Sequence, residues 1–195
     1  MDYIKSKYFP FITNYDKLKY DKEGLWSITM PNDAKIISDI ILKEIGYNKI
    51  IFDGTAGIGG NTLSFSKTFK KVISIELDKN RFDILKNNIN IYNYNNIILY
   101  NDNCFNLLNL ECDVYFFDPP WGGPNYKKIN KLKVKLSNKS LYDIIMYIKN
   151  NNIQLTTINN KKIFFKIPTN YDLLEFSNFN YKIYKIKQYN IIVIY

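Results

Sequence analysis

The sequence of 195 residues contains no histidine, a single arginine, Arg81, and only two cysteines. The absence of histidine removes imidazole, the side chain most often used in general acid–base catalysis. Cys104 and Cys112 do not have the spacing of a metal site, and in a chain without a secretion signal we expect both thiols to be reduced and buried. The sequence therefore predicts neither a metal centre nor histidine-dependent chemistry.

Long apolar runs are also missing. No stretch approaches the roughly 18 apolar residues of a membrane span, and residues 1–10 lack a signal-peptide pattern. Hydrophobic residues nonetheless make up 46% of the chain and aromatic residues 16%, which predicts a folded globular protein. We expect an intracellular protein, cytoplasmic or nuclear, that is monomeric and does not associate with membranes.

Acidic residues are few compared with basic ones: 27 lysine and arginine residues stand against 18 aspartate and glutamate residues, and the net charge is +9. A positive field of this size attracts polyanions and raises their rate of encounter. The sequence is also rich in asparagine, isoleucine and tyrosine, whose codons share an AT-rich composition with those of lysine, so genome composition is an alternative source of the charge. The charge favours nucleic-acid binding without establishing it.

Short apolar runs alternate with helical patterns along most of the chain. Residues 1–30 show no clear periodicity and are interpreted as an irregular arm, or short helices, packing on the core. Helices are expected after Pro31–Asn32, near Asn61, over 79–92 and near 141–149. Strands are expected at 49–53, 72–76, 97–100, 114–118, 162–167, 182–188 and 191–195. The alternation predicts an α/β fold with a Rossmann-like, doubly wound, mostly parallel sheet and an antiparallel C-terminal strand, formed by a domain over 31–195.

A glycine-rich loop, residues 54–60, follows the first predicted strand and leads into a helix. Glycines let the backbone turn tightly and approach a ligand, and the helix N-terminus offers partly positive amides. Glu76 ends the next strand, where its carboxylate can accept hydrogen bonds from both hydroxyls of a ribose. This arrangement suits NAD and S-adenosylmethionine alike, and a plain turn whose glycines serve close packing is the alternative.

Two acidic residues favour S-adenosylmethionine. Asp53 would repel a pyrophosphate but can pair with the amino group of a methionine moiety. Asp102, just past the third strand, can accept a hydrogen bond from the adenine amine. The residues predicted to bind this donor are Asp53, Thr55, Gly57, Gly59, Asn61, Thr62, Glu76, Asp102 and Asn103.

The run Asp118–Pro119–Pro120–Trp121, directly after the fourth predicted strand, indicates the reaction class. Two consecutive prolines hold a rigid backbone whose carbonyls are fixed acceptors. An exocyclic amine on a purine is a poor nucleophile because its lone pair is delocalised into the ring. The carboxylate of Asp118 and the carbonyl of Pro119 can accept its hydrogens and stabilise the positive charge that grows on nitrogen, while Trp121 stacks on the base. We therefore predict methyl transfer to an amino nitrogen of a nucleic-acid base.

The run from Asp118 to Tyr126, D-P-P-W-G-G-P-N-Y, closely resembles the trimethylguanosine synthase family, as do residues 57–62, G-I-G-G-N-T, and the segment 21–29. That family methylates the 2-amino group of the 7-methylguanosine cap on RNA. The resemblance implies that Trp121 stacks on the methylated guanine, that Asp118 and Pro119 hold its 2-amino group, and that Glu76 binds the donor ribose. The positive charge of the 7-methylated ring adds a cation–π contribution of about 0.5–2 kcal/mol to the stacking.

Further residues are predicted to bind this substrate. Trp26 falls on an aromatic position of the family and either completes a sandwich around the base or packs the arm. Asn125 and Tyr126 can reach the triphosphate of the cap together with Lys127, Lys128, Lys131, Lys133 and Lys135, although a solvated lysine loop is the alternative. Two positions depart from the family pattern. Asp118 stands where serine is frequent, and Thr169 stands where a phosphate-binding arginine is expected, so phosphate contacts must come from lysine.

The sequence thus predicts an S-adenosylmethionine-dependent cap guanine-N2 methyltransferase, with 7-methylguanosine-capped RNA as its partner and Asp118, Pro119 and Trp121 as catalytic residues. Two alternatives stay open. One is a guanine-N2 or adenine-N6 methyltransferase acting on structured RNA or DNA. The other is a cap- or RNA-binding module that has lost catalysis, against which the intact acidic residues of the two predicted sites argue.

Overall fold

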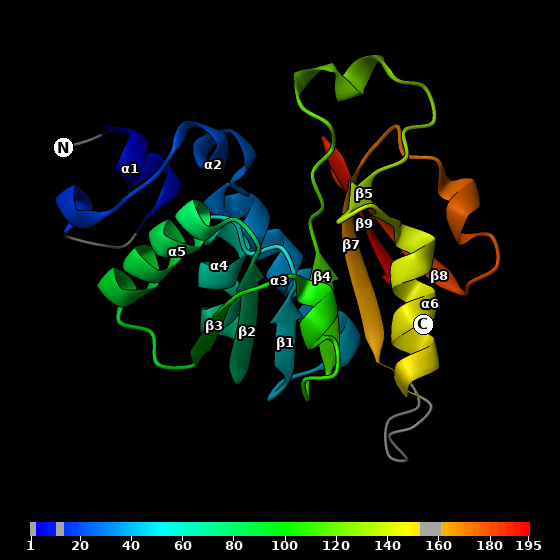
Figure 1. The fold of residues 1–195 in the computed structure, drawn as a ribbon, viewed down its shortest axis with the longest axis horizontal. Helices are drawn as coiled ribbons and strands as arrows, with labels where there is room; N and C mark the ends of the chain where they lie inside the picture. The colour runs from blue at the N-terminus through cyan, green and yellow to red at the C-terminus, as the bar shows by residue number, and fades with distance from the viewer. Residues whose placement is uncertain (1–2, 11–13, 153–160) are drawn as a thin grey trace. The chain divides into compact units, whose positions relative to one another are not determined.

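A computed structural model describes residues 3–10, 14–152 and 161–195 of the chain, which divides into two compact units, residues 1–113 and 114–195 (Figure 1). This division differs from the expected boundary at residue 30, which stays a prediction. Among the described residues, no helix combines the length and apolarity that crossing a bilayer requires.

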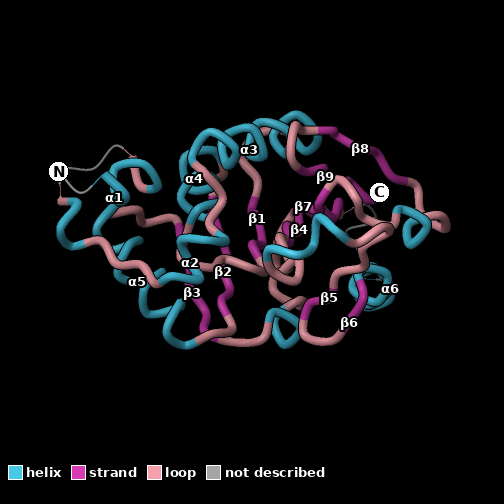
Figure 2. Tube along the Cα trace, turned by 90° about the horizontal axis from the view of Figure 1, so that it is seen from above, coloured by secondary structure: helices cyan, strands magenta, loops and turns pink. Residues whose placement is uncertain are grey.

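The first unit contains three parallel strands in the order β3-β2-β1. They are β1 (Ile50–Asp53), β2 (Lys71–Glu76) and β3 (Ile97–Asn101). Helices α3 (Pro31–Ile45), α4 (Gly60–Thr68) and α5 (Lys79–Tyr92) accompany them. Helix α3 packs on α4, as Figure 2 shows, and α5 packs on β2 and β3. Because the three strands are parallel, their carboxyl ends lie at the same edge of the sheet, which is where ligands of α/β folds bind.

The described part of the arm consists of short helices rather than irregular chain. They are α1 (Tyr3–Tyr8), the 3-10 helix η1 (Tyr15–Lys17) and α2 (Lys22–Ser27). Phe9 and Leu18 are buried in one hydrophobic cluster with Leu85 and Ile89 of α5. The amide of Asn88 also exchanges hydrogen bonds with the backbone of Lys19, at 3.0 and 2.9 Å. Because the arm contributes side chains to the cluster, it belongs structurally to the first unit.

The larger sheet segment of the second unit consists of four strands in the order β4-β7-β9-β8. They are β4 (Val114–Phe117), β7 (Lys162–Pro168), β9 (Tyr189–Ile194) and β8 (Tyr181–Lys185). Strand β4 pairs with β7 in parallel, while β9 runs antiparallel to both β7 and β8. Helix α6 (Leu141–Asn152) and the 3-10 helices η3 (Pro124–Lys128) and η4 (Leu173–Phe176) complete this unit, and η2 (Cys104–Leu107) belongs to the first. Aromatic side chains of β4 and β7 form much of the core of the second unit.

The predicted fold class is confirmed, with mostly parallel strands and an antiparallel C-terminal strand, β9. A short hairpin, β5 (Lys135–Leu136) and β6 (Lys139–Ser140), was not expected from the sequence. Its two-residue turn, Ser137–Asn138, has positive φ at both positions, as a type I′ turn requires. Strands of two residues leave no alternation of apolar and polar side chains to detect, which explains why the hairpin was missed.

Candidate active site

The predicted donor loop turns at two glycines of positive φ, Gly57 at 56° and Gly59 at 110°. Gly59 caps the N-terminus of α4 in the left-handed conformation, which costs least without a Cβ. A Cβ added to Gly57 would meet nothing within 4 Å, whereas one added to Gly59 would lie 3.1 Å from the side chain of Leu85. Gly57 therefore borders open space that a ligand can enter, and Gly59 borders the core.

Asp53, at the end of β1, is fully buried. Its carboxylate accepts a hydrogen bond from the hydroxyl of Thr62 at 2.7 Å and another from the amide of Thr55 at 3.3 Å. The hydroxyl of Thr62 also lies 3.1 Å from that of Ser74 on β2. These contacts tie β1, the glycine loop and the first turn of α4 together. The predicted pairing of Asp53 with the donor's amino group stays a prediction.

Glu76 lies at the end of β2, and its side chain is only 10% exposed. Its two oxygens accept hydrogen bonds from the amides of Gly57 and Asp78, both at 2.8 Å. The guanidinium of Arg81 lies 3.5 Å from the same carboxylate and 2.8 Å from Glu23 of α2. Burial alone would lower the pKa of Arg81, but the carboxylates of Glu76 and Glu23 raise it overall. Backbone amides and a permanent cation therefore hold Glu76 in one orientation.

The remaining predicted donor residues also lie in the first unit. Asn61 is buried and donates to the hydroxyl of Thr29 at 3.0 Å. Its amide oxygen is buried and has no hydrogen-bond partner among the described residues. Asp102 follows β3 and accepts hydrogen bonds from the amide of Asn103 at 2.6 Å and the side chain of Asn106 at 2.8 Å. The structure thus places all of the predicted donor residues in one unit, at the last residues of β1 and β2, in the first turn of α4, or in the loops that follow β1 and β3.

The predicted catalytic residues Asp118, Pro119 and Trp121 lie in the second unit, directly after β4, whereas Trp26 lies on α2 of the first unit. Asp118 is 13% exposed in its side chain and forms an ion pair with Lys166 of β7, with 2.7 Å between the carboxylate oxygen and Nζ. Pro119 is buried and Pro120 is exposed. Figure 1 shows the chain continuing from β4 into an extended connection that contains η3.

Trp121 is partly exposed and is not sealed in the core. The ring of Tyr126 contacts it edge-to-face, with 5.2 Å between ring centroids and 72° between planes. Its indole N–H is buried and makes no hydrogen bond within the described part of the chain. The side chain of Asn170, which follows β7, donates hydrogen bonds to the carbonyls of Tyr126 at 2.8 Å and Ile129 at 2.6 Å. The loop that carries the pair of aromatic rings is therefore fixed by hydrogen bonds from a residue that follows β7.

Trp26, on α2, is 57% exposed. Both alternatives for its indole, stacking on a base and packing on the arm, stay predictions. Asn125 of η3 is exposed, as are the five lysines predicted to reach the cap phosphates. Lys133 lies 3.9 Å from Asp172. Exposed lysines suit contact with a polyanion but do not by themselves define a site.

Both cysteines are buried, as expected. Burial raises the pKa of the Cys104 thiol to about 12, so the thiolate that nucleophilic attack or metal binding needs is scarce at neutral pH. Among the described residues, no group of three or more potential metal ligands comes together.

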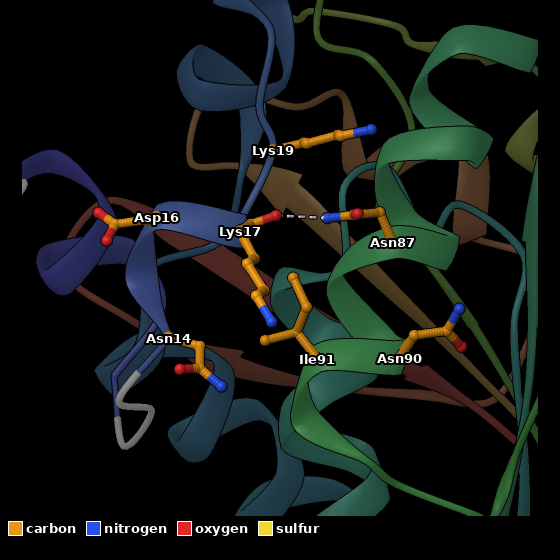
Figure 3. Close-up of a pocket in the computed structure, with 7 residues that line it drawn as sticks. All are labelled: Asn14, Asp16, Lys17, Lys19, Asn87, Asn90 and Ile91. Carbon is orange, nitrogen blue, oxygen red and sulfur yellow. Dashed lines mark hydrogen bonds between the residues drawn. The ribbon is translucent and has the colours of Figure 1, made fainter.

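A polar cavity of about 590 Å³ lies in the first unit beside α5 (Figure 3). It is lined by Asn14, Asp16, Lys17, Lys19, Asn87, Asn90 and Ile91. The amide of Asn87 donates to the carbonyl of Lys17 at 2.9 Å and so joins α5 to the arm. None of the predicted donor or acceptor residues lines this cavity, so it is separate from the candidate site.

Three residues near the predicted sites were missed by the sequence analysis: Lys166, Tyr189 and Asn170. Nζ of Lys166 lies 5.3 Å from the ring centroid of Trp121 and 5.4 Å from that of Tyr189. Lys166 lies in the predicted strand between apolar neighbours, Phe165 and Ile167, which was a visible signal because lysine is rarely buried without a partner. Asn170 and Tyr189 gave no comparable signal.

Comparison with known proteins matches residues 48–195 to the family described as RNA cap guanine-N2 methyltransferase. "Uncharacterized protein L320" of Acanthamoeba polyphaga mimivirus is 33% identical over 216 residues, which cover 96% of this chain and 80% of that protein. Trimethylguanosine synthase of Schizosaccharomyces pombe is 28% identical over 151 residues. That match covers 73% of this chain, which spans 62% of the length of the yeast protein.

Solved structures of methyltransferases share the fold at low sequence identity. A putative methyltransferase, yhhF of Escherichia coli, superposes with a TM-score of 0.57 at 16% identity, covering 83% of this chain and 84% of that one. SMU.1697c of Streptococcus mutans, solved in complex with SAH, gives 0.55 at 14% identity, covering 86% and 98%. These likenesses establish the Rossmann-like methyltransferase fold.

Proposed function

Because the chain belongs to the RNA cap guanine-N2 methyltransferase family, we propose that it methylates the 2-amino group of the 7-methylguanosine cap of RNA. Its methyl donor is S-adenosylmethionine. The observation that carries this proposal is the turn after β4. A carboxylate, two prolines and a partly exposed indole follow one another there, at the carboxyl end of a parallel strand. Ligands of α/β folds bind at this end of the strands.

The donor residues of the first unit fit S-adenosylmethionine. Gly57 leaves open space beside the backbone, and Asn61 has a buried amide oxygen without a partner among the described residues. When bound, S-adenosylmethionine supplies an electrophilic methyl group on a positively charged sulfur. Glu76, already oriented by two amides, would accept hydrogen bonds from the ribose hydroxyls, and Asp102 and Asn103 would border the adenine. Asp53, which is predicted to pair with the donor's amino group, also holds the loop through its hydrogen bonds with Thr55 and Thr62.

The acceptor residues of the second unit would prepare the amine. Asp118 and the carbonyl of Pro119 accept hydrogens from the 2-amino group, which localises its lone pair and stabilises the charge that develops on nitrogen. Trp121 stacks on the guanine, worth about 1–3 kcal/mol. The methylated nitrogen then loses its proton to water, so the absence of histidine from the sequence is no obstacle. The exposed lysines of residues 127–135 would meet the triphosphate.

Methyl transfer from radiolabelled S-adenosylmethionine to three acceptors tests the proposal. The acceptors are a cap dinucleotide with 7-methylguanosine, the same dinucleotide without the 7-methyl group, and an uncapped structured RNA. We expect the 7-methylated dinucleotide to be the best acceptor. Equal rates of methylation of the two dinucleotides would contradict the claim that the protein recognises the 7-methyl group of the cap. Binding of caps without any transfer would favour an inactive cap-binding module.

One observation supports a second candidate. A match of 108 residues, at 27% identity, links 55% of this chain to ribosomal RNA small subunit methyltransferase A of Caldanaerobacter subterraneus. An acid, two prolines and an aromatic residue also suit amino-group methylation of a base in structured RNA. Under this alternative the uncapped RNA would be methylated and both dinucleotides would be inert.

A further inference from the structure

Lys166 is a buried cation beside the proposed acceptor residues. It lies in β7, is 7% exposed and pairs with Asp118. The pairing follows from the register of two parallel strands. Phe116 is opposite Phe164 and Phe117 is opposite Phe165. The next residue on each chain segment is Asp118 after β4 and Lys166 in β7, so the register makes these two residues neighbours. Burial of a single charge is costly, and each of these residues balances the other.

The ammonium group of Lys166 also lies over two aromatic rings. Its Nζ is 5.3 Å from the ring centroid of Trp121 and 5.4 Å from that of Tyr189. Both distances are within the range in which a cation is attracted by the face of a ring. The indole proposed to stack on the cap guanine therefore already interacts with a positive charge that belongs to the protein.

We propose that Lys166 is a specificity-determining residue, whose charge sets how strongly the acceptor site prefers a positively charged 7-methylguanine over a neutral guanine. The inference rests on the proposed function, because it takes Trp121 and Asp118 as the acceptor residues. With Lys166 and Asp118 both charged, the pair contributes no net charge to the site. In the wild type, the 7-methylated base is then recognised mainly by stacking on the indole, and the ion pair changes its binding free energy little.

Changing either partner shifts this balance in a defined direction. Lys166→Met leaves the carboxylate alone, so a positively charged base gains attraction and the preference for 7-methylguanine rises. Asp118→Asn leaves the ammonium alone, so the same base is repelled and the preference falls. The double variant is neutral again. Charges a few ångströms apart in a partly solvated site interact strongly enough to change the preference about three- to tenfold in each direction.

The experiment is isothermal titration calorimetry of the wild type and these three variants with 7-methylguanosine triphosphate and with guanosine triphosphate. S-adenosylhomocysteine is present at saturation, and the buffer is slightly acidic so that the 7-methylated ring keeps its charge. The quantity compared is the ratio of the two Kd values within each variant, which cancels the contribution of the phosphates and any loss common to both nucleotides. Lys166→Arg, which keeps the charge, is the matched control.

The expected order of the preference is Lys166→Met highest, wild type, Lys166→Arg and the double variant in the middle, and Asp118→Asn lowest. Burial of the unpaired carboxylate can prevent Lys166→Met from folding. In that case the inference is still tested by two results: the preference for 7-methylguanosine triphosphate falls in Asp118→Asn and returns to the wild-type ratio in the double variant. Equal ratios in every folded protein would overturn the inference while leaving cap methylation by the wild type intact. A wild type that binds neither nucleotide and methylates no cap would overturn the proposed function and the inference together.

Discussion

The predicted donor region and the predicted acceptor region are each stabilised by contacts of a different kind. In the donor region, two hydrogen bonds that shape the glycine loop join partners close in sequence: Thr62 and Asp53 are 9 residues apart, and Gly57 and Glu76 are 19 apart. In the acceptor region, Asp118 pairs with a lysine 48 residues away, and the amide that holds Tyr126 comes from 44 residues away. A donor loop can therefore be recognised from a short stretch of sequence, whereas the acceptor pocket depends on a distant strand.

This difference has a functional consequence. Local hydrogen bonds fix the donor loop in one conformation, so changes there are expected to affect donor binding and stability together. The contacts that stabilise the acceptor loop include the ion pair of Asp118 with Lys166, the ring contact of Trp121 with Tyr126 and the hydrogen bonds donated by Asn170. Changes there are expected to affect acceptor recognition while the donor region, which belongs to the other unit, keeps its affinity.

The largest expected effect is that of Trp121→Ala. Removal of the indole eliminates the stacking surface, and kcat/KM for the 7-methylated cap dinucleotide falls by about a hundredfold or more. Affinity for S-adenosylmethionine, measured by calorimetry, changes little. Tyr47→Ala is the matched control, because it removes an aromatic ring from a position that is 79% exposed and has no predicted role in either region. An equal collapse of donor affinity in Trp121→Ala would contradict the separation of the two regions.

Glu76→Gln is expected to show the reverse pattern. The charged acceptor of the ribose hydroxyls is lost, and hydrogen bonds to charged groups contribute about 1.5–3 kcal/mol. S-adenosylmethionine affinity should therefore fall about ten- to a hundredfold, while binding of 7-methylguanosine triphosphate is preserved. Glu111→Gln, at an exposed position, serves as the control. Unchanged donor affinity in the Glu76 variant would refute its ribose role.

Thr62→Val tests the buried network of the donor loop. The substitution removes the hydroxyl that donates to the fully buried carboxylate of Asp53. Loss of a partner for a buried group costs about 1–3 kcal/mol, so the free energy of unfolding in urea should fall by that amount. Thr68→Val, on the same helix, removes a hydroxyl that donates only to a backbone carbonyl and should cost less. Equal losses in the two variants would show that the Asp53 contact is not special.

Asn170→Ala is expected to give the smallest effect. It removes both hydrogen bonds that hold the loop carrying Tyr126, and neutral hydrogen bonds contribute about 0.5–1.5 kcal/mol each. The KM for the cap dinucleotide should rise about three- to tenfold, with donor affinity unchanged. Thr169→Ala, at the exposed neighbouring position, is the control. If kcat fell with KM unaltered, Asn170 would not act by positioning the acceptor loop.

The contrast between local and distant partners also explains what the sequence could predict. Strand–loop–helix spacing predicted β1, β2, α4 and α5, and with them the loop that contains Gly57 and the position of Glu76, because those features depend on short stretches of chain. Lys166 was missed, although a lysine inside an apolar run was visible, because its partner is set by the register of β4 against β7. The coupling of Arg81 to Glu23 of the arm was missed for the same reason.

The most direct test of the central claim is mass spectrometry of nucleosides released from a 7-methylguanosine cap dinucleotide after incubation with the protein and S-adenosylmethionine. The account predicts that the added methyl mass appears on the cap guanine, at its exocyclic 2-amino nitrogen. A methyl group on the ribose or on the other nucleoside, or an unmodified cap in the presence of protein that binds the donor, would contradict it.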